Sequence, residues 1–218
     1  MTDDGTLNDR GQAFPIYIVV VAGLLFAALA FFVVGQASTV RSDAQGAADA
    51  AALAAARDAR DHLGPGVDLL TLKPEGWKKV LDGLLLDADG ACGAAQTFAA
   101  KNAATAVCEP ALPRFTVEVK TTGTVGNSVV PGVSGQHGTA DATAIIEPRC
   151  HLSAVVVEPS SSPSPSSSAS PSPSPSGEEK PTSVEIKCKG GAVIKFNPAK
   201  PEPWSTLARK LFAVRLVD

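Results

Sequence analysis

The hydrophobic pattern begins with one long uncharged run, residues 14–34 (FPIYIVVVAGLLFAALAFFVV). As a helix rising 1.5 Å per residue, this run would cover about 31 Å, which matches the ~30 Å hydrocarbon core of a bilayer. The flank before it carries three aspartates beside Arg10, and the run is longer than the apolar core of a cleaved signal peptide. Residues 35–37 (GQA) have the small-x-small form of a cleavage site, so a signal peptide is the alternative. We expect a retained transmembrane helix.

Helical periodicity continues over residues 36–64, where Ala fills nearly every candidate core position (DAQGAADAAALAAARDAR, residues 43–60). Ala has the highest helix propensity, so this segment can stay helical without bulky core residues, and Gly64-Pro65-Gly66 ends it. It is either a solvated stalk or a helix with a narrow packing face that docks on a partner helix or on the protein's own globular head. The residues of that face are Gly23 and Ala27 within the apolar run, and then Ala44, Ala47, Ala48, Ala51, Ala54 and Ala55.

In the rest of the chain, hydrophobic residues first recur at helical spacing and later alternate with polar residues as in β-strands. Residues 75–89 (EGWKKVLDGLLLDAD) predict a core-facing helix with Trp77, Val80, Leu81, Leu84 and Leu85 inward, and residues 92–104 predict a shorter one. Period-2 alternation predicts strands at 115–125, 139–148, 152–159, 182–188 and 192–196. The segment after Pro203 is expected to pack back as a final helix or strand through Trp204, Leu207, Leu211 and Phe212. The predicted fold class is α+β, with a small antiparallel sheet.

Residues 159–176 (PSSSPSPSSSASPSPSPS) are Pro or Ser at every position but Ala169. Such a tract cannot bury apolar surface and is expected to be extended or disordered. Strand-like sequence flanks it on both sides, which favours a loop within one domain; an interdomain spacer is the alternative. The expected organisation is a cytoplasmic N-terminus (1–13), a transmembrane helix (14–35), an Ala-rich extracytoplasmic helix (36–64), an α+β domain (65–157), the Ser/Pro-rich insertion (158–182) and a C-terminal part that completes the domain (183–218).

Four cysteines, Cys92, Cys108, Cys150 and Cys188, all follow the apolar run without metal-ligand spacing. An even number of widely spaced cysteines predicts two disulfides in an oxidising compartment, which places everything after about Gly35 outside the cell membrane. Of the three possible pairings we prefer Cys92–Cys108 with Cys150–Cys188, because each closes a local excursion of the chain. An unbroken helix would hold Cys92 and Cys108 about 24 Å apart, so the preferred pairing requires the chain to fold back near Asn102.

Composition narrows the classes of function. The net charge is -3 and there is no basic block, so nucleic acid is not an expected partner. His62, His137 and His151 are the only histidines, and no zinc, nucleophile-elbow or phosphate-loop motif surrounds them. We therefore expect no catalytic, cofactor-binding or metal-binding residues, and a protein that is not an enzyme.

The first 60 residues resemble the N-terminal segment of the Tad/Flp pilus-assembly family, the TadE/TadG-like proteins. The matching stretches are DRGQAFPIYIVVVAGLLFAALAFFVVGQAS (residues 9–38) and AQGAADAAALAAA (residues 44–56). The later part is similar to the extracytoplasmic regions of actinobacterial-type members, which have paired cysteines. The resemblance implies a single-pass, pilin-like or accessory component of surface-filament assembly, whose partners are the bilayer and other pilus-assembly membrane proteins or pilin-like helices.

Two departures limit what the resemblance implies. Prepilin processing needs an acidic residue five positions after the cleaved Gly. Five positions after Gly11 the sequence has Ile16, so cleavage and incorporation as a typical pilin do not carry over. The Asp-x-Ser-x-Ser motif of longer TadG-like members is absent, so metal-dependent adhesion does not carry over. The alternative function is a membrane-anchored envelope-binding module with no pilus role, in which the Ala-rich helix is only a stalk.

Overall fold

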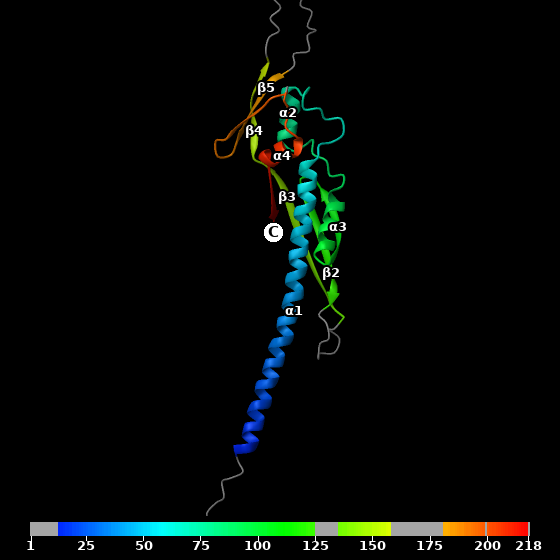
Figure 1. Ribbon diagram of the computed structural model, residues 1–218, viewed down its shortest axis with the longest axis vertical. Coiled ribbons are helices and arrows are strands. Elements are labelled where there is room, and N and C mark those ends of the chain that lie inside the picture. The colour runs from blue at the N-terminus through cyan, green and yellow to red at the C-terminus, as the bar shows by residue number, and fades with distance from the viewer. Residues whose placement is uncertain (1–12, 125–134, 158–180, 199, 218) are drawn as a thin grey trace, which may run out of the picture.

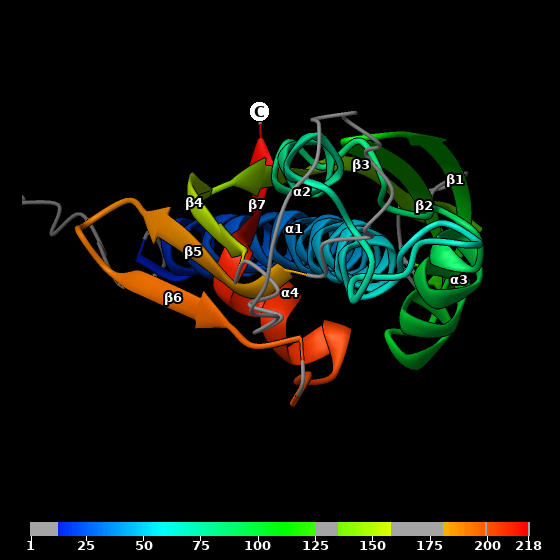
Figure 2. The same ribbon diagram turned by 90° about the horizontal axis from the view of Figure 1, so that it is seen from above.

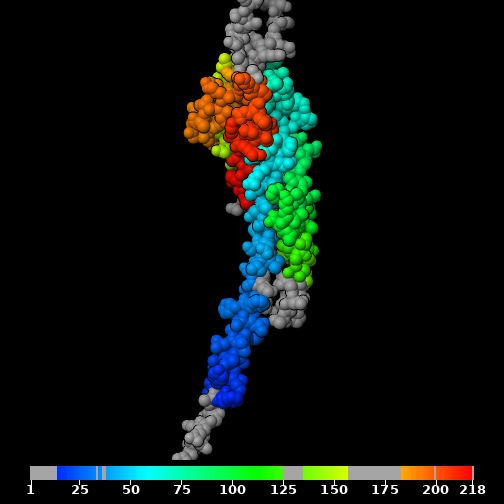
Figure 3. Space-filling model, viewed as in Figure 1, coloured from blue at the N-terminus to red at the C-terminus, as the bar shows by residue number. Residues whose placement is uncertain are grey.

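Helix α1 (Ala13–Asp61) organises the molecule, because it runs without a break through 49 residues, about 74 Å at 1.5 Å per residue (Figure 1). The computed structural model describes residues 13–124, 135–157, 181–198 and 200–217. The N-terminal half of α1 projects alone, and the C-terminal half enters a globular head (Figure 3). Within α1, the stretch Phe14–Phe32 is long and apolar enough to cross a membrane, and none of it is buried against the rest of the protein.

A four-stranded antiparallel sheet covers one side of the C-terminal half of α1. Its strands are β1 (Ala104–Ala111), β2 (Arg114–Thr124), β3 (His137–Pro148) and β7 (Phe212–Val217), in the spatial order β1-β2-β3-β7. Strand β2 alternates as its sequence predicts, since Phe115, Val117 and Val119 are buried and the residues between them are exposed.

A second antiparallel sheet follows directly from the first. It contains β4 (Cys150–Val157), β5 (Pro181–Cys188) and β6 (Val193–Phe196), in that order. Only Arg149 separates β3 from β4, so the chain passes directly from one sheet into the other. Val184, Ile186 and Phe196 face the core from this sheet.

Three shorter helices complete the head around α1 (Figure 2). They are α2 (Pro74–Leu81), α3 (Ala91–Lys101) and α4 (Trp204–Leu211). Helix α2 packs on the second sheet, where the rings of Trp77 and Phe196 lie 4.9 Å apart. Helix α3 packs on α1 and on β1. The α+β class, the apolar N-terminal helix, the antiparallel sheets and the two disulfides are therefore as expected from the sequence.

The predicted helix over 75–89 was too long. Helix α2 ends at Leu81, because Gly83 adopts a φ of +77° that turns the chain away. Leu84, expected in the core, is 71% exposed, and Leu86 is buried in its place. Leu86 forms an isolated antiparallel bridge with Leu63, which ties this turn to the segment after α1.

Two further boundaries differ from the expectation. The predicted helix over 92–104 ends at Lys101, and the unforeseen strand β1 begins at Ala104. The C-terminal segment forms both alternatives in succession, helix α4 and then strand β7. The predicted N-terminal segment 1–13, apart from Ala13, and the Ser/Pro-rich insertion 158–182, apart from Pro181 and Thr182, lie outside the described residues.

Candidate functional site

The N-terminal part of α1, residues 14–34, which we call the bare half, carries most of the exposed large hydrophobic side chains that the structure describes. Its bulky side chains are strongly exposed, with Phe26 at 78% and Phe31 at 80%. Gly23 lies within it and has open space where a Cβ would be, and Ala27 is exposed. The structure therefore places these two members of the predicted packing face on a surface that no other described part of the chain covers.

The alanines of the C-terminal half have the opposite environment, because the protein's own head covers them. All six predicted packing residues of this half are buried, and Ala52, Ala56 and Ala59, which the prediction missed, are fully buried as well. The stretch is covered by β3, β2 and α3. Of the two occupants expected for this face, the structure shows the head. The segment is a core element and not a solvated stalk.

Helix α3 explains why alanine is needed at these positions. Its inward stripe is also alanine, formed by Ala91, Ala95 and Ala99, each fully buried. When both contacting faces carry only methyl groups, two helices can approach more closely than bulkier side chains allow. The sequence signal for the additional buried alanines is that alanine occupies several sides of the helix in this segment, and not only one stripe.

The entry of α1 into the head is a backbone-to-backbone contact. A Cβ built on Gly138 of β3 would lie 2.5 Å from the carbonyl oxygen of Val40 and 3.1 Å from the Cβ of Ala44. One turn further, the Gln45 side-chain amide donates to the Asp141 carbonyl at 3.3 Å and to the Asp49 carboxylate at 2.9 Å. The helix thus covers the part of β3 that β7 does not reach, since β7 pairs with β3 only from Thr143 onward.

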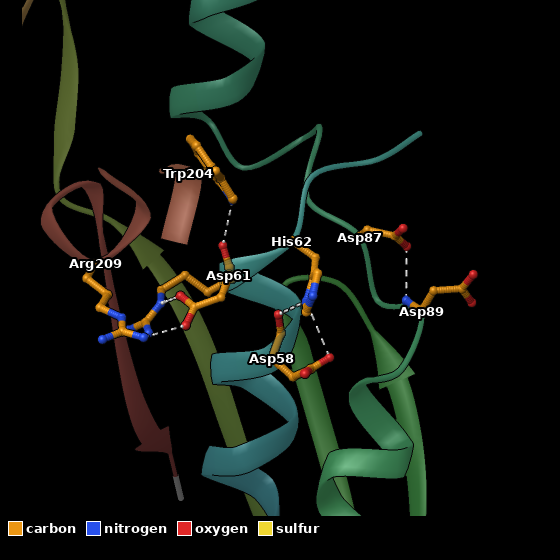
Figure 4. Close-up of polar contacts among 8 residues, drawn as sticks. Asp58, Asp61, His62, Asp87, Asp89, Trp204 and Arg209 are labelled. Carbon is orange, nitrogen blue, oxygen red and sulfur yellow. Dashed lines mark hydrogen bonds and ion pairs between the residues drawn. The ribbon is translucent and has the colours of Figure 1, made fainter. Parts of the chain in front are cut away.

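Polar contacts from α4 secure the other end of α1 (Figure 4). The Trp204 indole N–H donates to the Arg60 carbonyl at 3.1 Å, which satisfies one of the carbonyls that the last turn leaves unpaired. The Asp61 carboxylate lies 2.8 Å from Arg60 Nε and 3.3 Å from Arg209 Nη2. These contacts fix the C-terminal segment on α1, so their role is structural.

His62 and three aspartates lie near this junction. The Nδ1 atom of His62 is 2.7 Å from the Asp58 carbonyl and 3.6 Å from Asp58 Oδ2, while Asp87 accepts a hydrogen bond from the Asp89 backbone at 2.9 Å. In the described part of the chain, no three His, Cys, Asp or Glu side chains are placed to hold a metal ion. His137 bonds the Thr121 carbonyl at 2.7 Å, and His151 is exposed on β4. The structure therefore does not bring the three histidines together.

Both disulfides follow the preferred pairing. Cys92 and Cys108 are joined with Cα atoms 5.5 Å apart, and they connect α3 to β1. The chain folds back immediately after Lys101, where the preferred pairing required it. Cys150 and Cys188 are directly opposite each other on β4 and β5, so this bond closes the start of the second sheet.

Three surface groups have shifted pKa values. The Arg215 guanidinium donates a hydrogen bond to Glu147 at 2.6 Å, which lowers the pKa of Glu147 and raises that of Arg215. On the second sheet, the hydrogen bond with Glu185 raises the pKa of Lys195. Lys195 and Arg215 are exposed and Glu147 is half-buried, so the two ion pairs, between β3 and β7 and between β5 and β6, contribute little to stability.

The comparison with protein families concerns mainly α1. Residues 11–58 match the Tad family, described as "Putative Flp pilus-assembly TadE/G-like". The matched range ends near the end of α1 and includes both the bare half and the alanine-rich half. No curated protein and no solved structure matches the chain. The resemblance of the N-terminal segment is thus confirmed, and it supports a pilus-related role.

Proposed function

We propose that this protein is a membrane-anchored, pilin-like or accessory component of Tad/Flp-type pilus assembly at the bacterial cell surface, and an actinobacterial-type member of its family. The observation that carries the proposal is the division of α1. One unbroken helix is bare and apolar over Phe14–Phe32 and is the centre of the head from Ala44 onward.

This division suits a subunit that passes from a bilayer into a filament. Lipid can cover the bare half, and the same surface can later be covered by the bare helices of neighbouring subunits. Association between such helices relies on close approach through small residues, and Gly23 and Ala27 provide one such position. The head travels with the helix as a rigid unit, because the helix is its core.

The proposed topology has the N-terminus in the cytoplasm and the head outside. The two disulfides support it, since such bonds persist in oxidising compartments. The partners we propose are the bilayer and other pilus-assembly membrane proteins or pilin-like helices. The role needs no catalysis, cofactor or nucleic acid.

A filament test separates this function from a general envelope-binding module. Surface filaments are purified from wild-type cells and from cells that lack the protein, and the fractions are probed for this chain. We expect the chain in the filaments, or a loss of filaments in its absence. Normal filaments that neither contain nor require the chain would contradict the proposal and favour the envelope-binding module.

The anchor is tested with the same cells. Carbonate extraction of membranes should leave the full-length chain in the pellet, and mass spectrometry should recover peptides from residues 14–34. A mature chain that starts near residue 38 and is released by carbonate would show that the apolar run is a cleaved signal peptide.

A further inference from the structure

The outer face of the four-stranded sheet carries carboxylates that repel one another. Glu118 on β2 lies directly opposite Asp141 on β3, and both are exposed. Like charges directly opposite each other destabilise a sheet. Glu109, on β1, lies one rung away, opposite Thr116. We call Glu109, Glu118 and Asp141 the acidic row.

The acidic row lines a hollow of about 340 Å³, and the described residues that line it include no Lys or Arg. Val107 also lines the hollow and is 67% exposed, an uncovered apolar side chain between the carboxylates. Lys120 is one rung away on the same face, yet among the described residues no ion pair joins it to the acidic row. The hollow therefore has the charge, the size and the apolar centre to receive the aliphatic stem and ammonium of a lysine from another molecule.

The second sheet carries the opposite arrangement. Lys187 on β5 lies directly opposite His151 on β4, and in the next rung the Lys189 N–H donates to the Arg149 carbonyl at 2.7 Å. We call Arg149, Lys187 and Lys189 the basic row; all three are exposed. The carboxylates on the neighbouring positions are engaged in ion pairs, Glu147 with Arg215 and Glu185 with Lys195, and Glu147 is also attracted by the charge of Lys189.

We propose that the acidic row of one copy of this chain docks on the basic row of a second copy, a contact that rests on the function proposed above. The acidic row holds a like-charge opposition, Glu118 against Asp141, and the basic row places Arg149 beside Lys189, so each row offers the partner charge that the other lacks. Opposed charges on two surfaces select the partner and the register of docking.

The position of the rows determines the kind of assembly. Arg149 is eight residues beyond Asp141 along β3 and β4, a separation of at most about 26 Å at 3.3 Å per residue. Parallel copies share one orientation, so the second copy must be displaced along the axis of α1 for its basic row to reach the acidic row, and the contact therefore forms between copies that have left the bilayer. A contact between two different patches repeats from copy to copy and builds an open filament when its rotation does not close a ring.

Zero-length cross-linking of the full-length chain in detergent, where copies are free to shift along α1, tests the contact. Copies expressed separately in ¹⁵N medium and in unlabelled medium are purified and mixed, and a carbodiimide joins carboxylates to neighbouring lysines. We expect mixed-label peptides that join Glu118 or Asp141 to Lys187 or Lys189. Cross-links that map elsewhere, or that never combine the two labels, would overturn the proposal.

Charge reversal then tests whether the contact depends on these residues. Glu118→Lys with Asp141→Lys should lower the amount of untagged copy that co-purifies with a tagged copy at least about tenfold, and so should Lys187→Glu with Lys189→Glu. Combining all four substitutions should restore association with the charges exchanged. Lys101→Glu, on the exposed side of α3, is the matched control and should change nothing. Disulfide content on a non-reducing gel checks that each variant is folded.

The outcomes distinguish this contact from the proposed function. If the chain is present in filaments and charge reversal of either row does not reduce association between copies, the result contradicts the contact and leaves the filament role in place. Cross-links that depend on both rows, in cells whose filaments do not need the chain, support the contact and contradict the filament role. If reversal of the acidic row abolishes an association that reversal of the basic row leaves intact, the acidic row meets a different protein and the proposal is wrong.

Discussion

Gly138 and Val40 touch through their backbones, since a Cβ on Gly138 would lie 2.5 Å from the Val40 carbonyl oxygen. Helix α1 therefore enters the head at a position where β3 cannot carry a side chain. We expect Gly138→Ala to destabilise the head by about 1–3 kcal/mol, because neither backbone can move away without breaking its own hydrogen bonds. Urea unfolding followed by circular dichroism measures this loss.

Gly46 provides the matched control for Gly138. It lies on the exposed side of α1, and an added Cβ there meets nothing within 4 Å. Gly46→Ala should stabilise the helix by about 0.5–1 kcal/mol, since Gly is a poor helix former. Equal effects of the two substitutions would show that Gly138 is not a tight contact.

Larger side chains on the buried alanine face are expected to destabilise the packing of α1 against α3. Ala51 and Ala55 are fully buried in the core, so there is no space for a Leu side chain at either position. We expect each change to cost about 1–3 kcal/mol and to loosen α3 from α1. Thermal unfolding of the full-length chain in detergent measures the loss.

Ala27→Leu is the control for the alanine face and a probe of helix association. Ala27 is exposed on the bare half of α1, so the substitution should leave the unfolding temperature of the head unchanged. If bare helices pack closely in filaments, it should reduce filament yield with a normally folded head. A loss of filaments with Ala51→Leu alone would reflect misfolding and carry no information about partners.

Trp204 predicts a smaller effect at the C-terminal end of α1. Its indole N–H donates to the Arg60 carbonyl, and Trp204→Phe removes the donor while an aromatic ring remains beside Phe212. We expect a loss of about 0.5–1.5 kcal/mol in the free energy of unfolding. Arg209→Gln removes a surface ion pair with Asp61 and should cost less, at most about 1 kcal/mol. The order of the two effects in denaturant titrations checks the assignment.

The disulfides predict a graded loss on reduction. By the chain-entropy argument, the bond that spans 16 residues is worth about 3 kcal/mol and the bond that spans 38 residues about 4 kcal/mol. Paired substitution to Ser of Cys92 with Cys108, or of Cys150 with Cys188, should lower the unfolding temperature in an oxidising buffer. The fully reduced wild type should lose more than either pair variant. An unfolding temperature that does not change on reduction would contradict the structural role of both bonds.

The sequence predicted correctly those features that depend on interactions between residues close together in the chain. The apolar run, the alternation of β2 and the local closure by Cys92 and Cys108 each depend on a few neighbouring residues. Helix α2 was overextended because Leu84 and Leu85 continue its spacing, and only the positive φ of Gly83 ends it. What covers the alanines could not be predicted, because a methyl group fits a stalk, a partner helix and a core equally well. Pairing across strands was also hidden, since register depends on contacts between distant segments.

Glu118→Gln tests the balance between folding and association. The substitution removes the like-charge opposition with Asp141, so it should stabilise the isolated chain by about 0.2–1 kcal/mol. The same change removes a charge from the acidic row, so the amount of untagged copy that co-purifies with a tagged copy should fall. Asp43→Asn, on the exposed side of α1, is the control: it removes an exposed carboxylate outside the acidic row and should leave co-purification of the two copies unchanged. A variant that is more stable yet associates less would show that the acidic row is kept for docking at a cost to the fold, whereas a destabilised Glu118→Gln would mean that Glu118 already has a favourable partner within its own chain.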